Sequence, residues 1–226
     1  MTMGFFPEHI KMLMGEGHSV EIATNCEQPL PEIYKTLCCK SYDIRFSRSP
    51  FDKDNLTAYK QLKALVEKEH YDIVHCHTPN AAMVTRLACR KVRKQGTRVF
   101  YTAHGFHFFK GAPLKNWLMY YPVEKFCARY TDVLITINHE DFELAKKKMH
   151  VQKVCYVPGV GIDLSKIQNI QCNFCSTLWN RSSRSYFIIF HTVKESKSHN
   201  IKYWIRRYLS WRCIFIACKP MLFKSS

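Results

Sequence analysis

Glycine is absent from the last third of this sequence. The chain has 226 residues and eight glycines, none of which lies after Gly161, although average usage would place roughly four or five there. The same stretch has a single alanine, Ala217, and a single proline, Pro220, so it is short of the residues that make turns. Residues 164–226 are therefore expected to be either a poorly ordered basic tail or a translation in another reading frame, and their composition favours the second.

Long apolar runs and a targeting signal are also lacking. No apolar run approaches the roughly 18 residues that a membrane-spanning helix requires. A secretory signal begins with a basic stretch that is followed by an apolar one. The first residues of this sequence have no such pattern. We therefore expect a cytoplasmic chain whose membrane contact, where there is any, is at the inner face.

A metal-ligand pattern is lacking as well. Of the eleven cysteines, Cys172 and Cys175 form a lone CxxC, whereas a zinc site usually needs a second pair at a suitable spacing. Cys213 and Cys218 are too far apart to supply that pair. The sequence therefore predicts no metal site.

Positive charge, in contrast, is abundant, and most of the excess lies in the tail. The net charge is +16, and residues 162–226 hold 11 Lys/Arg against two Asp/Glu. A basic nucleic-acid-binding protein stays open as the alternative function, although the tail has little of the aromatic and basic interleaving that such proteins use. A dinucleotide-binding enzyme would need G-x-G-x-x-G after its first strand, and no such string occurs.

Residues 1–163 alternate regularly between strand and helix patterns. Strands are expected at 18–24, 42–46, 71–75, 98–102, 132–137 and 153–157, and helices at 8–16, 54–66, 80–94, 114–130 and 138–149. Asn138 is a candidate N-cap of the last of these helices. Repeated strand–helix units imply an α/β fold in which a Rossmann-like parallel sheet has helices on both faces.

Ligands in such sheets bind at the carboxyl ends of the strands, so the residues there are the first candidates for a function. His104 follows a central strand, where an imidazole could hydrogen-bond a substrate hydroxyl near neutral pH or simply hold its own loop. Gly105 could let a substrate approach the backbone or could make a turn. We interpret His75 and His77 as pointing to opposite faces of their strand, with only His77 at the ligand edge.

Several motifs in register resemble the N-terminal domain of the family 4 glycosyltransferases, which have the GT-B architecture. The matching pieces are GFFPEHIKMLMGEGHSVEIATN, YDIVHCHTPNAAMVTRLA, VFYTAHGFHFF, TDVLITINHEDFELA and VPGVGID, which cover about residues 4–163. The match is of the type that builds capsular or other extracellular polysaccharides. It implies transfer of a sugar from a nucleotide-sugar donor to a saccharide or lipid-linked acceptor, with retention and without a metal or another cofactor. The acceptor would bind mainly in this domain, and the donor mainly in a second one.

The resemblance also implies roles for particular residues. His104 matches the family's histidine after a central strand and is the candidate catalytic residue. The candidates for acceptor binding are Gly4, His9, His77, Gly105 and Phe106, and the hinge to the donor domain would contain Pro158, Gly159 and Gly161. Packing in the core is the favoured alternative for Phe106 and its neighbours Phe108 and Phe109.

The sequence departs from the family at both ends. Family members begin with an apolar strand before the loop that contains Gly4. That strand lies in the middle of the sheet, so its absence predicts unpaired backbone groups and a gap in the core. After Asp163 a donor domain should bring a glycine-bearing phosphate loop and paired glutamates, but the only further acid is Glu195. We therefore expect a domain at 1–163 with an atypical tail, a truncated transferase that is inactive alone.

Overall fold

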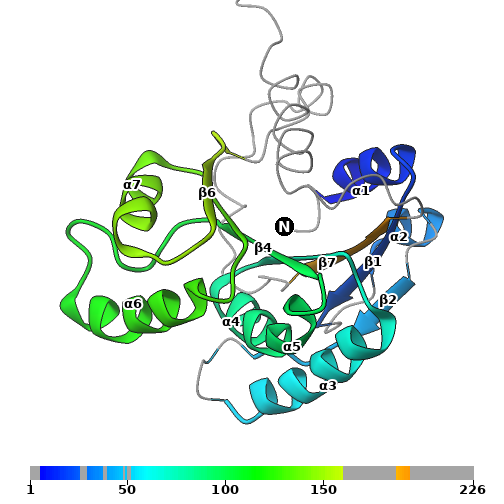
Figure 1. Cartoon of the computed structure of the whole chain (residues 1–226), viewed down its shortest axis with the longest axis horizontal. Coiled ribbons are helices and arrows are strands. Elements are labelled where there is room, and N and C mark those ends of the chain that lie inside the picture. The colour runs from blue at the N-terminus through cyan, green and yellow to red at the C-terminus, as the bar shows by residue number, and fades with distance from the viewer. Residues whose placement is uncertain are drawn as a thin grey trace, which may run out of the picture.

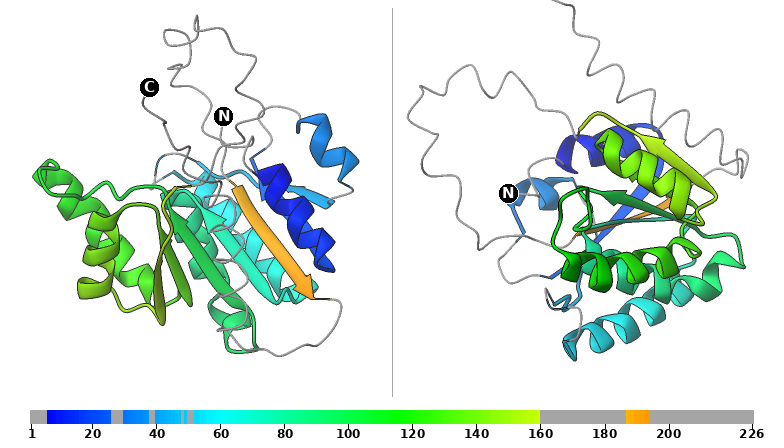
Figure 2. Two further views of the ribbon diagram at one scale, coloured as in Figure 1. Left: turned by 90° about the horizontal axis from the view of Figure 1, so that it is seen from above. Right: turned by 90° about the vertical axis from the view of Figure 1, so that its left-hand side faces the viewer.

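The computed structural model describes residues 6–25, 30–37, 40–47, 49 and 52–159, together with the backbone of 187–193. Within these ranges the predicted α/β class is confirmed, because helices cover both faces of a single sheet (Figure 1). The right-hand view of Figure 2 shows α3 and α6 on one face and α1 and α7 on the other. The expectations for Gly4, Gly161, the Cys172–Cys175 motif and the rest of the tail lie outside the described residues.

The helices and strands follow the predicted alternation closely. In chain order they are α1 (Phe6–Gly15), β1 (His18–Thr24), α2 (Glu32–Thr36), β2 (Lys40–Asp43), α3 (Asp54–Glu69), β3 (Ile73–His77), α4 (Pro79–Ala88), α5 (Arg90–Arg93), β4 (Arg98–Ala103), α6 (Leu114–Ala128), β5 (Val133–Thr136), α7 (His139–Lys148), β6 (Lys153–Tyr156) and β7 (Phe187–Val193). The sequence patterns missed the short helix α2 and the strand β7. The helix expected at 80–94 is divided into α4 and α5 around Cys89.

The sheet has the strand order β2-β1-β7-β3-β4-β5-β6. All described pairings between the first six strands are parallel, whereas β7 pairs antiparallel with both β1 and β3. The expectation of unpaired backbone groups in the middle of the sheet is therefore wrong. A strand from the tail lies where the family's first strand was expected, and it supplies hydrogen bonds to both neighbours. Residues 187–193 thus belong to the sheet of the front segment.

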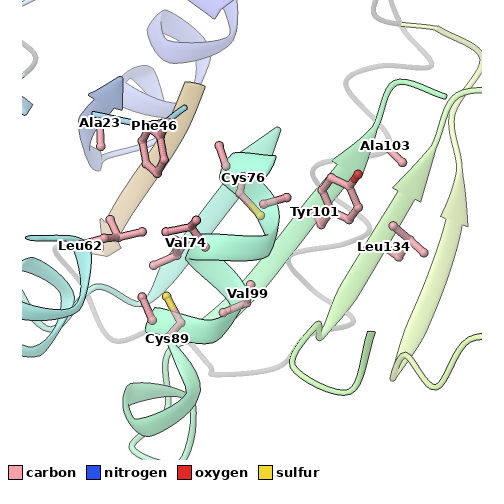
Figure 3. Close-up of a cluster of buried hydrophobic side chains, with 14 of the residues drawn as sticks. Ala23, Phe46, Leu62, Val74, Cys76, Cys89, Val99, Tyr101, Ala103 and Leu134 are labelled. Atoms are coloured by element: carbon pink, nitrogen blue, oxygen red, sulfur yellow. The ribbon is translucent and has the colours of Figure 1, made fainter. Parts of the chain in front are cut away.

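The core divides according to the alternation of side chains along each strand. Val74 and Cys76 of β3 pack in the larger cluster, with Leu62 of α3 and Val99 and Tyr101 of β4 (Figure 3). A smaller cluster is made by alternate residues of β3, β4, β5 and β6 and the residue after β6, which are Ile73, Phe100, Val133, Ile135, Cys155 and Val157. Successive residues of a strand point to opposite faces of the sheet. The strands that appear in the sequence as continuous apolar runs are therefore buried on both faces.

The cysteines of the described part behave as small apolar side chains. Cys76, Cys89, Cys127 and Cys155 are all free and buried. Burial raises the pKa of the Cys76 thiol to about 12, so this thiol stays protonated near neutral pH and is a poor nucleophile. These residues therefore contribute to the packing of the core.

None of the described helices combines the length and the apolar character needed to cross a membrane. The longest, α3, has 16 residues, and its buried side chains form one stripe that faces α4 and the sheet. Helix α6 contains Pro122 and still continues to Ala128, so this proline does not end the helix.

Candidate functional site

The carboxyl ends of β3, β4, β5 and β6 meet at one edge of the sheet, because these strands are neighbours and run parallel. This edge is where ligands bind in open parallel sheets. Each strand there is followed by a polar residue, a glycine or a proline: Thr78 after β3, His104 after β4, Asn138 just beyond β5, and Pro158 and Gly159 just beyond β6. The structure therefore gathers most of the described sequence candidates on one edge.

Three histidines and a threonine form a row on one face of the sheet, which we call the histidine row. Its members are His75 and His77 of β3, Thr102 of β4 and His104. His75 Nε2 lies 2.8 Å from Thr102 Oγ1, and the rings of His75 and His77 have centroids 4.2 Å apart. Residues two apart on a strand share a face, so the interpretation of His75 and His77 as pointing to opposite faces is wrong.

His104 is the exposed end of the histidine row. His77 Nδ1 lies 3.2 Å from His104 Nε2, and His77 itself is only 2% exposed. The His77 ring also makes a T-shaped contact with the Phe6 ring from α1, with centroids 4.8 Å apart. The buried His77 therefore stands behind His104 and holds it by a hydrogen bond in which one imidazole donates and the other accepts.

The loop after β4 is held by the start of α7. Asp141 Oδ2 accepts a hydrogen bond from the Phe106 backbone N–H at 2.9 Å and another from Asn138 Nδ2 at 2.8 Å. Asn138 Oδ1 accepts in turn from the Asp141 N–H at 2.8 Å, which confirms Asn138 as the N-cap of α7. We missed Asp141, although its position three residues after an N-cap is the spacing of a reciprocal cap.

The residues that follow His104 mainly shape the loop or pack in the core. Gly105 has φ +127, and a Cβ there would meet nothing within 4 Å, so its conformation, not crowding by protein atoms, requires glycine. Phe106 and Phe108 are 6% and 1% exposed, and their rings stack with centroids 4.8 Å apart. Phe106 and Phe108 therefore pack in the core, as the favoured alternative predicted. Phe109 does not, because it is 44% exposed.

Thr78 has an uncommon backbone conformation next to the histidine row. Its φ is +66, which is costly for a β-branched residue. It lies between His77 and Pro79, the first residue of α4. No sequence pattern indicated this feature, and such strain tends to occur at functional edges of a fold.

The remaining candidates are placed less centrally. His9 is half-buried on α1, the helix whose Phe6 contacts His77. Pro158 and Gly159 follow β6, and Gly159 has φ +79. Among the described residues no group of three or more His, Cys, Asp or Glu side chains could hold a metal ion.

Comparisons with known proteins show which family the chain resembles. A model of Glycosyltransferase Family 4 matches residues 8–166. Over 170 residues the chain is 50% identical to "Putative glycosyltransferase EpsD" of Bacillus subtilis (strain 168), covering 74% of this chain and 42% of that protein. Over 120 residues it is 33% identical to "UDP-Gal:alpha-D-GlcNAc-diphosphoundecaprenol alpha-1,3-galactosyltransferase" of Escherichia coli, covering 50% of this chain and 30% of that protein. The chain thus spans less than half the length of these relatives.

Proposed function

Because the chain belongs to glycosyltransferase family 4, we propose that residues 1–163, completed by strand β7, form the acceptor-side domain of a GT-B-type sugar transferase that acts with retention. The whole enzyme would move a sugar from a nucleotide-sugar donor to a saccharide or lipid-linked acceptor during polysaccharide assembly. The observation that carries this proposal is the exposed imidazole of His104 at the ligand edge of the sheet, within the residues that the family model matches. The nucleic-acid alternative has no comparable support.

The proposed acceptor class draws on the relatives. The name of the Escherichia coli relative describes galactosyl transfer to a GlcNAc-diphosphoundecaprenol, which is a saccharide linked to a lipid through a diphosphate. The name of the Bacillus subtilis relative states a glycosyltransferase without a substrate. A lipid-linked saccharide is therefore the acceptor class that we propose first for this chain.

His104 is the proposed contact to the acceptor hydroxyl or to the transferring sugar. A neutral imidazole can accept a proton or donate a hydrogen bond near neutral pH. His77 would act as a positioning residue, because its ring is buried and touches His104 rather than the edge itself. Gly105 and His9 are the nearby candidates for further acceptor contacts, and Pro158 and Gly159 for the described part of the hinge.

Replacing His104 with alanine should weaken acceptor binding about 2- to 10-fold, because one hydrogen bond contributes about 0.5–1.5 kcal/mol. The probe is a soluble short-chain prenyl-diphosphate saccharide, titrated by calorimetry into the full chain. His150→Ala is the matched control, since His150 is also exposed but precedes β6 at the opposite edge of the sheet. Equal affinities for the two variants would remove His104 from the acceptor site.

We also propose that residues 1–226 alone do not complete the transfer. Residues 164–226 contain no glycine for a phosphate loop, and Glu195 is their only acid. Stabilising the leaving diphosphate is a large part of the catalysis of such a reaction. We therefore expect no release of nucleoside diphosphate when the purified chain is incubated with UDP-, GDP- or dTDP-sugars and the same acceptor. Release above that of a His104→Ala control would contradict this proposal.

A peripheral contact with the inner membrane face is the last part of the proposal, and α6 is its proposed surface. Leu114 and Leu118, one turn apart, are 72% and 70% exposed, and Phe126 is 46% exposed. Lys115 and Lys125 are exposed on the same helix. The only carboxylate of α6, Glu124, is buried and paired with Arg86. An apolar face with basic neighbours and no exposed acid is complementary to an anionic lipid surface.

Vesicle binding tests this surface. Leu118→Asp should reduce sedimentation of the chain with phosphatidylglycerol vesicles about 10-fold, because it replaces an inserted apolar group with a charge that the lipid repels. Leu56→Asp is the control, since Leu56 is 59% exposed on another helix, α3. The contact is refuted if wild-type chain binds neutral phosphatidylcholine vesicles equally well, or if both variants behave alike.

A further inference from the structure

The position between β1 and β3 is where the family resemblance placed the first strand of the domain, and β7 fills it instead. We call it the strand slot. Its occupant runs antiparallel to both neighbours, with Ile189 opposite Ile22 of β1 and Phe190 opposite Val74 of β3. The same strand pairs with β1 along all of Phe187–Val193. Figure 2 shows β7 in orange, lying between its two neighbours in the sheet.

The strand slot selects its occupant through the backbone. β3 is buried at every position, and β1 is buried or half-buried throughout. Water therefore cannot readily replace the hydrogen bonds that the facing N–H and C=O groups of β1 and β3 need. A slot of this kind accepts an extended segment by main-chain pairing, as in strand addition at a sheet edge, and apolar residues suit its buried faces. The sequence Phe187-Ile-Ile-Phe190 meets that requirement.

We propose that the strand slot accepts Phe187–Val193 from a second copy of this chain as well as from its own, which produces a strand-exchanged dimer. The backbone pairs with β1 and β3 are the same in both arrangements, so the interface itself does not favour either. What favours the chain's own strand is the connection from Gly159 to Phe187. That connection is long enough, on the order of 90 Å when extended, to reach a neighbouring molecule.

The length of this connection also determines how strongly the fraction of dimer should depend on the concentration of the chain. Effective concentrations within one chain are roughly millimolar for short linkers and fall as the connection between the two segments lengthens. A second copy present at a comparable concentration therefore competes with the chain's own strand while the chains fold. Exchange of an identical segment between copies is a common route to dimers.

The experiment is refolding of the full chain at two concentrations, about 5 µM and about 500 µM, followed by light scattering at equal dilution. We expect monomer at the lower concentration and, at the higher one, a second species of about twice the 26.7 kDa chain mass. Co-refolding of copies with two different affinity tags should give a mixed dimer that both tags capture. Only monomer at both concentrations would overturn the proposal.

Two proline variants test whether β7 makes the dimer. Ile189→Pro removes one strand N–H in the middle of β7, whereas Ser196→Pro makes the same change outside the strand. We expect dimer in the second variant and none in the first. A dimer that Ile189→Pro leaves intact would overturn the proposal, since it would use another surface.

A synthetic peptide shows whether Ile189→Pro retains a usable slot. The peptide spans residues 184–197 of the natural sequence and stands in for the strand of a second copy. It should raise the melting midpoint of Ile189→Pro by at least about 5 °C at saturation, and the same peptide with proline at 189 should not. Failure of the natural peptide to raise that midpoint would also overturn the proposal, because the slot would then not accept a strand from outside.

Discussion

Replacing Glu124 with alanine is expected to lower the free energy of unfolding by about 3–5 kcal/mol, because it leaves the buried Arg86 charge without its partner. Arg86 is 1% exposed and Glu124 6%. Their side chains form two hydrogen bonds, from Nη1 to Oε2 at 2.8 Å and from Nη2 to Oε1 at 3.1 Å. The guanidinium also donates from Nε to the Ala82 carbonyl at 3.0 Å and lies over the Tyr101 ring, 4.5 Å from its centroid.

The charge on Arg86 persists when Glu124 is removed. Burial lowers the pKa of Arg86 and the Glu124 carboxylate raises it. An arginine nevertheless does not lose its proton in the accessible pH range. The variant therefore has to hold an unpaired cation in the core or to admit water there, and either outcome is destabilising.

Urea unfolding followed by circular dichroism measures this effect, with Glu143→Ala as the matched control. Glu143 pairs with Lys147 at 3.5 Å on the surface, where both side chains are more than half exposed, so its loss should cost less than about 0.5 kcal/mol. The double variant Arg86→Met with Glu124→Leu should recover most of the stability, since apolar residues of similar volume can replace a buried pair. A Glu124→Ala chain as stable as Glu143→Ala would mean that the pair contributes nothing.

Shortening the chain to residues 1–163 should have the second large effect, loss of cooperative unfolding. It removes β7 and leaves β1 and β3 with unpaired groups facing each other in the middle of the sheet. Each buried backbone group without a partner costs about 1–3 kcal/mol, so several of them together reach the roughly 5–15 kcal/mol of net stability that a domain has. Exposed strand edges also promote association. We expect a partly unfolded or aggregated product.

The test compares thermal unfolding of three lengths of the chain under the same conditions: the full chain, residues 1–197 and residues 1–163. Residues 1–197 retain β7 and should unfold like the full chain, whereas 1–163 should show a broad transition and sediment as aggregate. An apolar strand added before Gly4 of the 1–163 chain should restore soluble yield by filling the same slot. A cooperative, monomeric 1–163 chain would show that the strand slot does not need an occupant.

The local patterns of the sequence predicted most of the elements and their arrangement. Period-2 and period-3.6 apolar repeats depend on neighbouring residues alone, so the alternation through residue 157 could be recognised in isolation. The same is true of the Asn138 cap, which depends on a residue three positions away. Once a parallel sheet is inferred, the location of His104 at the ligand edge follows from strand direction.

The tertiary structure decided the contacts that join distant parts of the chain. The Arg86–Glu124 pair, the His77–His104 hydrogen bond and the pairing of β7 with β1 all connect segments with no local relation in sequence. The shared face of His75 and His77 could have been derived from the strand period, and our interpretation missed it. The sequence determined by itself most of the strands and helices up to residue 157, α2 excepted, because those preferences are local. Which strand fills the middle of the sheet was decided only in three dimensions, because backbone hydrogen bonds carry little sequence information and are satisfied by whichever segment the fold brings there.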